Sequence, residues 1–236
     1  MSDDAELNTT SVDLGGLLTV LGANLYSSPE VAVRELVQNA HDACTRRRIE
    51  APGAGVGEIV IGASPGRIWI EDTGAGLTRD EIKRYLATIG AGYTGVLRRS
   101  TEDSALIGAF GLGFLSAYMV AKRVEVVSTS YQSPDIGVRF VSDSGRTYVI
   151  QAAPARSIGS RIDLELRDEC AHIADLFTLE RVLHAHCRLL HVPIRLDWSG
   201  RVINAHPPPW RREDLAGAPQ FLAALWVPPE AYGNMR

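Results

Sequence analysis

Three short groups of polar residues and glycines could bind a nucleotide. In the first group the spacings are four, three and four residues, which places the side chains on one face of a helix; its members are Glu35, Asn39, Asp42 and Arg46. An Asn amide oxygen is a suitable ligand for Mg²⁺, and a Glu one turn earlier could polarise a water beside a metal-bound phosphate. A solvated helix face has the same pattern, so this group alone does not decide the matter.

The second group, Asp72-Thr-Gly74-Ala-Gly76, follows a run of strand-forming residues. An ionised carboxylate only accepts hydrogen bonds, so a buried Asp72 could accept one from the exocyclic amine of adenine, while the glycines let the base approach the backbone. Guanine carries an oxygen at that position and would be rejected. Asp and Gly also form ordinary strand-to-turn connections, which is the structural alternative.

The third group, Gly108-Ala-Phe110-Gly111-Leu112-Gly113, precedes an apolar helical pattern that begins at Phe114. Backbone N–H groups at a helix start bind phosphate through unsatisfied donors and the positive end of the helix dipole. The spacing is neither that of a P-loop nor that of a dinucleotide-binding turn. A flexible loop that packs its two phenylalanines into the core is the alternative.

Hydrophobic periodicity predicts the elements that position these groups. A helix is expected over residues 30–48, with Ser28 as its cap and Pro29 at its first position. A hairpin follows over 58–63 and 67–71, and the capping box Thr78-Arg-Asp-Glu81 opens a helix that ends near residue 90. The polar, Gly-containing and irregular stretch at 90–107 is interpreted as a flap, which belongs to a lid at about 88–107. The other predicted elements are a helix over 113–121, strands over 124–130, 137–142, 147–152 and 160–166, a helix over 176–190 and a strand over 194–198.

These elements predict an α/β (α+β) two-layer sandwich, in which helices cover one face of a mostly antiparallel mixed sheet. The composition changes to Pro207-Pro-Pro209-Trp210 and a charged patch, so residues 1–203 are expected to form one domain and residues 204–236 a linker and the start of another. About thirty residues are too few for a second core.

Composition narrows the function classes. The chain has 236 residues, 45% of them hydrophobic, which is enough for a sizeable core, and its net charge of -4 argues against a nucleic-acid partner. Three cysteines without CxxC spacing favour a reducing compartment, and the N-terminus lacks a signal-peptide core, so a cytoplasmic location and no membrane contact are expected.

His184, Cys187 and His191 share a helical face and could bind zinc, although core or interface packing explains them more simply.

Taken together, the motifs resemble the ATP-binding boxes of the gyrase, heat shock chaperone, histidine kinase and MutL superfamily. Order and spacing agree for Glu35-Leu-Val-Gln-Asn39-Ala-His-Asp42-Ala43, for Asp72-x-Gly74-x-Gly76 and for residues 107–118. Within the superfamily the chain is most similar to the N-terminal ATPase domain of the heat shock protein 90 chaperones, because Tyr26-Ser and Arg34-Glu-Leu surround the first box. Ile203-Asn and Pro209-Trp210 resemble the start of that family's middle domain.

This resemblance implies the Bergerat ATP-binding fold, with ATP or ADP and Mg²⁺ held between the helices and the sheet. It implies Glu35 as the general base, Asn39 as the Mg²⁺ ligand and Asp72 as the acceptor for adenine. The other residues that it places at the nucleotide are Asp42, Ala43, Arg46, Gly74, Gly76, Leu77, Gly108, Phe110, Gly111, Leu112, Gly113, Phe114 and Ser160.

The chain departs from the family pattern at two of these residues and at one residue of the predicted lid. Ser160 stands where a Thr is usual, and Arg46 where a Lys often stands. Ala91 replaces a phosphate-contacting lysine of the lid, a contact that Arg98 or Arg99 could supply instead.

The resemblance also implies a slow ATP-hydrolysing chaperone domain that takes part in protein folding and the stress response, with its nucleotide state coupled to lid closure and dimer contacts. A longer parent would be a homodimer that binds unfolded client proteins. The isolated chain is expected to be monomeric and weakly active, because it ends before the middle-domain Arg that reaches the γ-phosphate. An ATP-gated interaction module without a chaperone cycle and a MutL- or topoisomerase-like ATPase remain as alternatives.

Overall fold

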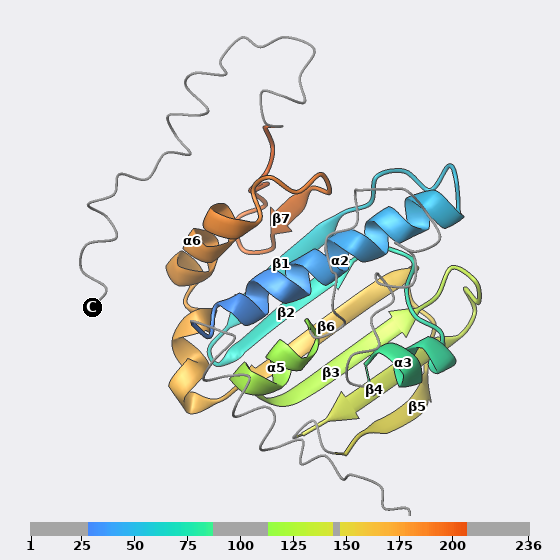
Figure 1. Cartoon of the computed structure of the whole chain (residues 1–236), viewed down its shortest axis with the longest axis horizontal. Coiled ribbons are helices and arrows are strands. Elements are labelled where there is room, and N and C mark those ends of the chain that lie inside the picture. The colour runs from blue at the N-terminus through green and yellow to red at the C-terminus, as the bar shows by residue number, and fades with distance from the viewer. Residues whose placement is uncertain (1–27, 87–112, 144–146, 207–236) are drawn as a thin grey trace, which may run out of the picture.

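A seven-stranded sheet with helices on one face forms the body of the molecule (Figure 1). The computed structural model describes residues 28–86, 113–143 and 147–206. The predicted lid at 88–107 lies outside the described residues, as do Gly108, Phe110, Gly111 and Leu112 and most of the predicted C-terminal segment.

The strand order is β5-β4-β3-β6-β2-β1-β7, and every neighbouring pair is antiparallel except β1 with β7, which is parallel. The predicted mixed and mostly antiparallel sheet is therefore confirmed. The strands are β1 (Ile59–Ser64), β2 (Arg67–Asp72), β3 (Ala121–Thr129), β4 (Gly137–Ser142), β5 (Val149–Ala153), β6 (Gly159–Leu166) and β7 (Ile194–Leu196).

Alternation of apolar and polar residues gives the central strands one core face and one outer face. Val124 and Val126 of β3 are buried, whereas Glu125 between them lies on the outer face and pairs with Arg139 of β4. Both oxygens of that carboxylate accept hydrogen bonds from the guanidinium, at 2.6 and 2.7 Å. The outer face thus carries cross-strand ion pairs, which leaves the other face for the helices.

Helices α2 (Val31–Glu50) and α5 (Leu115–Val120) cover the core face of the sheet (Figure 1). The apolar stripe of α2 is fully buried, and this helix packs against β1, β2, α5 and α6. The remaining helical elements are α3 (Arg79–Tyr85), the 3-10 helix η1 (Asp168–Ala174) and α6 (Leu176–His186). The predicted two-layer sandwich is confirmed.

Several predicted element boundaries differ from the structure, among them the start of α2, the end of α6 and the start of β3. Helix α2 begins at Val31 rather than at Pro29, because residues 28–30 form a turn, and Ser28 hydrogen-bonds the Glu30 side chain instead of capping the helix. Helix α6 stops at His186, short of the predicted residue 190. Strand β3 starts at Ala121, where α5 ends, because pairing with Leu166 of β6 already begins there.

The predicted capping box of α3 is confirmed. The Glu81 amide donates to the Thr78 hydroxyl at 3.3 Å, and the Thr78 amide donates to the Glu81 carboxylate at 2.9 Å. Asp175 caps α6 in the same way by accepting from the Thr178 amide at 2.9 Å. A cap removes an unsatisfied donor from the first turn, so both helix starts are fixed locally.

Neither a membrane helix nor a metal cluster is found in the part of the chain that the structure describes. No helix there is long and apolar enough to span a bilayer. No three His, Cys, Asp or Glu side chains gather there as a metal ion would require. Two residues of the proposed zinc group have other contacts. Cys187 is fully buried in the core, and His184 Nε2 lies 3.8 Å from a carboxylate oxygen of Glu180.

Candidate functional site

Helix α2, which carries the first predicted group, packs against α5 and β2. Asp42 is buried, with His41 Nδ1 at 3.3 Å from its Oδ1, while Glu35 and Asn39 are half-buried. The Glu35 carboxylate pairs with the preceding residue, since Arg34 Nη2 lies 2.6 Å from Oε1. One carboxylate oxygen of Glu35 is therefore held by a guanidinium.

Gly113, the last residue of the third group, lies directly against the first group. A Cβ placed on it would lie 3.2 Å from Glu35 Oε2 and 3.4 Å from Asn39 Nδ2. The backbone at the start of α5 thus approaches the two side chains that were predicted to bind metal and to act as base. The earlier residues of this group lie outside the described ranges.

Asp72 ends β2 in a buried position, with only 6% of its surface exposed. Its Oδ1 accepts a hydrogen bond from the Gly74 amide at 2.8 Å, and the Ser160 backbone on the neighbouring strand also hydrogen-bonds it. Burial raises the pKa of this carboxyl to about 7, because desolvation outweighs these hydrogen bonds. Asp72 therefore exchanges its proton near neutral pH.

Residues 73–77 are clamped between α2 and the end of β3. The Ala75 amide donates to the Ala43 carbonyl of α2 at 2.9 Å, and a Cβ on Gly74 would lie 2.7 Å from the Ala43 Cβ. Gly76 has a φ of +63° and its Cα faces the Thr129 carbonyl so closely that a side chain could not fit. Glycine is required at both positions. At Gly74 the reason is the close approach of α2, and at Gly76 it is both the close approach of β3 and the positive φ.

A small buried layer of hydroxyl groups joins these strand ends. Ser160 Oγ of β6 lies 2.8 Å from Ser128 Oγ of β3, and Ser128 accepts a hydrogen bond from the Leu77 amide at 2.7 Å. Ser160 was predicted at the site from the resemblance, but Ser128 was not. The Ser128-Thr-Ser130 run at the end of an apolar strand is the sequence signal that could have indicated it.

A comparison with protein families gives a match that covers all three groups. Residues 26–164, which include all three groups, match the family model described as Histidine kinase-, DNA gyrase B-, and HSP90-like ATPase. The chain belongs to this ATPase family. Its sandwich agrees with the Bergerat fold expected from the motifs.

The predicted similarity of this ATPase chain to heat shock protein 90 chaperones is confirmed by individual relatives. It is 34% identical over 96% of its length to the chaperone protein HtpG of Mesorhizobium japonicum. It is 34% identical over 78% of its length to HtpG of Shewanella amazonensis, and 32% identical over 82% to the mitochondrial 75 kDa heat shock protein of Bos taurus. The chain spans 36%, 31% and 29% of these relatives, about a third of their length.

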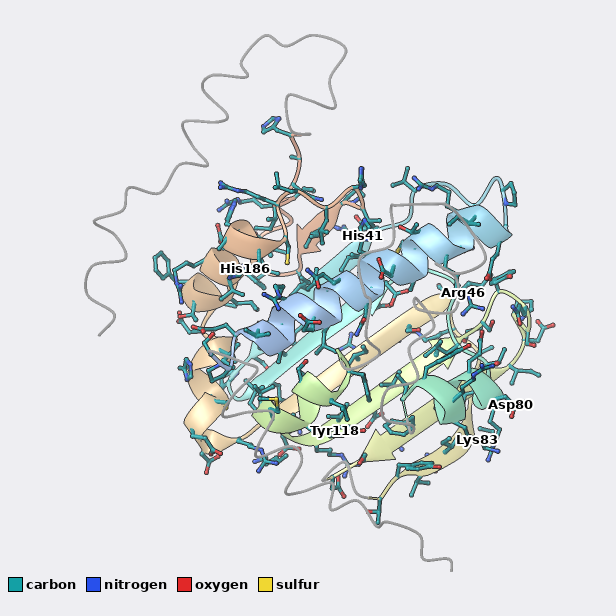
Figure 2. The ribbon with its side chains drawn as sticks, in the orientation of Figure 1. His41, Arg46, Asp80, Lys83, Tyr118 and His186 are labelled. Carbon is teal, nitrogen blue, oxygen red and sulfur yellow. The ribbon has the colours of Figure 1, made fainter. Side chains whose placement is uncertain are left out.

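Two residues predicted at the nucleotide have other contacts in this family member. Arg46 is buried near the C-terminal end of α2, beside α3 with its labelled Asp80 and Lys83, and donates to Glu50 and Glu81 (Figure 2). Phe114 is also buried, and its ring lies edge-on to Tyr118 at 5.6 Å and to Phe140 at 6.2 Å. Phe114 is thus part of the aromatic core, and its contact with the nucleotide stays a prediction.

Proposed function

We propose that this chain is the adenine-nucleotide-binding and ATP-hydrolysing domain of a chaperone similar to HtpG. The observation that carries the proposal is that one helix contacts both other motifs. Gly113 lies against Glu35 and Asn39 of α2, and Gly74 lies against Ala43 one turn further along the same helix. Because the chain belongs to a family of ATPases, a nucleotide is the expected ligand. The contacts of α2 with both other motifs support a single binding site for it.

Asp72 is proposed to select adenine. Its buried carboxylate accepts from the exocyclic amine, and the nearby Gly74, Gly76, Leu77 and Ser160 complete the surroundings of the base. A buried acceptor that meets the carbonyl oxygen of guanine is left without a partner, which costs binding free energy. The proposal therefore includes discrimination between the two purines.

Asn39 is proposed to hold Mg²⁺ through its amide oxygen. The residues present suit a hard cation, because Asn39 supplies an amide oxygen and Glu35, one turn away on the same helix, supplies a carboxylate, and both lie against Gly113. When bound, Mg²⁺ would neutralise phosphate charge in the transition state. Two neighbouring residues of α2 hold this stretch of the helix in place. Asp42 is buried, and Ala43 contacts Gly74 and accepts a hydrogen bond from the Ala75 amide.

Glu35 is proposed as the general base for the attacking water. Arg34 donates to Oε1, so Oε2, which faces Gly113, is the oxygen that can accept a proton on the side of the third motif. A positioned carboxylate of this kind contributes roughly 10²- to 10⁴-fold to a proton-transfer step. Arg34 orients the carboxylate and leaves its other oxygen for the water.

The remaining parts of the proposal rest on the resemblance and the relatives. Gly108, Phe110, Gly111 and Leu112 would contact phosphate, and the lid at about 88–107 would close over the nucleotide. A dimeric parent, client proteins, a cytoplasmic location, and a monomeric, weakly active isolated domain belong to the same proposal.

Replacing Glu35 tests the hydrolytic half of this proposal. We expect Glu35→Gln to lower Mg·ATP turnover by at least about 100-fold while ADP affinity, measured by calorimetry, stays within about threefold. Glu169→Gln is the matched control, because Glu169 is exposed on η1, away from the motifs. Full turnover in Glu35→Gln would show that another group is the base.

A second candidate is an ATP-gated interaction module that binds without hydrolysis. The Arg34–Glu35 ion pair favours it, because the guanidinium occupies one oxygen of the proposed base. The same assay separates the candidates: this module predicts ADP and ATP binding with no turnover in the unmodified chain.

A further inference from the structure

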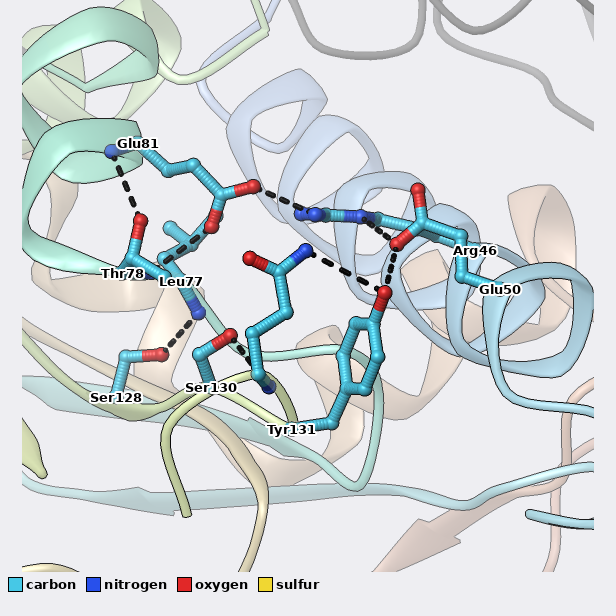
Figure 3. A network of polar contacts seen from close by, with 9 residues as sticks. Arg46, Glu50, Leu77, Thr78, Glu81, Ser128, Ser130 and Tyr131 are labelled. Atoms are coloured by element: carbon cyan, nitrogen blue, oxygen red, sulfur yellow. Dashed lines mark hydrogen bonds and ion pairs between the residues drawn. The ribbon is translucent and has the colours of Figure 1, made fainter. Parts of the chain in front are cut away.

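Arg46 makes two ion pairs inside the protein (Figure 3). Its side chain is 5% exposed, its Nε donates to Glu50 Oε2 at 2.9 Å, and its Nη2 donates to Glu81 Oε1 at 2.5 Å. Glu50 lies one turn along α2, whereas Glu81 belongs to α3, 35 positions away in the sequence. The guanidinium therefore bridges the two helices.

Glu81 has a second task at the start of α3. While its Oε1 accepts from Arg46, its Oε2 accepts from the Thr78 amide at 2.9 Å and completes the capping box. One carboxylate thus fixes the first turn of α3 and attaches that turn to α2. Loss of the Arg46 charge would leave this largely buried carboxylate without its cationic partner, which is costly in such an environment.

The bridge continues to the segment that follows Asp72. Tyr131 donates its hydroxyl to Glu50 Oε2 at 2.8 Å, and its backbone amide donates to the Ala75 carbonyl at 2.9 Å. On the other side, the Leu77 amide is held by Ser128 at 2.7 Å. Residues 75–78 are therefore held by a connected set of polar contacts, in which Arg46 joins Glu50 to Glu81; Figure 3 shows most of these residues.

We propose that Arg46 is a positioning residue of the adenine site and not a ligand of the nucleotide. It acts through Glu81 and Glu50, which set residues 75–78 and the first turn of α3 relative to α2, and so place the backbone beside Asp72. This inference rests on the proposed function, since it concerns the same site. It also reverses the role that the resemblance implied for this residue.

Affinities for adenosine and for ADP distinguish the two roles. A positioning role predicts that Arg46→Met and Glu81→Gln each weaken adenosine and ADP by the same factor, about tenfold, and that the double variant is no weaker than the worse single variant. Glu81→Gln keeps an acceptor for the Thr78 amide, so it removes the ion pair but not the cap. Arg46→Lys restores the charge and is expected to recover most of the affinity for both ligands.

Direct phosphate ligation predicts a different pattern and would overturn the inference. Arg46→Met would then weaken ADP but leave adenosine unchanged, and Glu81→Gln would leave ADP unchanged or tighten it by freeing the guanidinium. Arg48→Met is the matched control, because Arg48 is exposed on the same helix and should change neither affinity.

Amide hydrogen exchange of α3 without ligand separates failure of this inference from failure of the proposed function. If the bridge holds α3, residues 79–85 exchange faster in Arg46→Met than in Arg48→Met. If the unmodified chain binds neither adenosine nor ADP, the proposed function fails while the exchange result still tests the bridge. Unchanged exchange in Arg46→Met would contradict the bridge itself.

Discussion

At the scale of single residues, the fold gives two carboxylates different chemistry. Burial raises the pKa of Asp72 to about 7 although backbone N–H groups donate to its carboxylate, whereas Glu35 is half-buried and paired with Arg34. A desolvated carboxylate can recognise a single hydrogen-bond donor, and a half-buried carboxylate such as that of Glu35 can be reached by water. Their environments support the proposed division into adenine acceptor and general base.

The raised pKa of Asp72 predicts that adenosine binding releases a proton. The exocyclic amine donates a hydrogen bond, so it stabilises the ionised carboxylate and lowers the pKa from its value of about 7 in the free protein. Calorimetry at about pH 7 in two buffers of different ionisation enthalpy should show release of part of a proton, and at about pH 9 the release should vanish. Adenosine is preferable to ADP, whose phosphate also titrates near neutrality.

Two results would contradict this prediction. Adenosine binding at about pH 7 with no change in bound protons would mean that the carboxyl is already ionised or not involved. Uptake of a proton would mean that the neutral carboxylic acid is the form that binds, with its O–H as a donor.

At the scale of elements, the segment after β2 depends on backbone contacts that side chains would disturb. Gly76 combines a φ of +63° with close packing on the Thr129 carbonyl, while Gly66 has a φ of +71° and open space around it. The two glycines share the left-handed conformation and differ only in their surroundings. They therefore form a matched pair for measuring the contribution of this packing.

We expect Gly76→Ala to lower the free energy of unfolding by at least about 3 kcal/mol, because the new methyl group meets backbone atoms that cannot move freely. Gly66→Ala should cost only about 1 to 2 kcal/mol, which reflects the backbone conformation alone. Urea unfolding followed by circular dichroism measures both. Equal costs would show that the contact between residue 76 and β3 is not tight in solution.

Most elements could be predicted from the sequence because their signals are local. Alternation along β2 and β3 and the Thr78–Glu81 capping box are readable within a few residues, and the structure contains all three, with β3 starting three residues earlier than predicted. The role of Arg46 could not be predicted in this way, because it depends on Glu81, which only tertiary packing brings near. The 3-10 helix η1 was missed for a related reason: its short turn carries no periodic pattern.

At the scale of the whole molecule, an asparagine beyond β7 fastens the end of the packed body. The Asn204 side chain accepts from the Ile194 amide and donates to the Leu190 and Val192 carbonyls, each at 2.8 Å. Ile203 is also buried and its amide donates to the Ile194 carbonyl. The packed body therefore extends through residue 204, and a separate domain beyond the predicted boundary at 203 stays a prediction.

Removing the hydrogen bonds of the Asn204 side chain should affect the stability of the fold and not the nucleotide site. We expect Asn204→Ala to lower the free energy of unfolding by about 2 to 3 kcal/mol, because three backbone groups lose their partner. Ser199→Ala, which removes one long contact of 3.4 Å in an exposed turn, should cost less than about 0.5 kcal/mol. A change in adenosine affinity in Asn204→Ala would indicate that this end of the molecule is coupled to the site.

Titration of the chain with ADP and with GDP, before and after Asp72→Asn, tests the central claim most directly. We predict that the unmodified chain binds ADP at least about 100-fold more tightly than GDP, and that Asp72→Asn loses most of the ADP affinity while its circular dichroism spectrum is unchanged. Equal affinity for the two nucleotides, or unchanged ADP affinity in Asp72→Asn, would contradict the claim that Asp72 recognises adenine at this site.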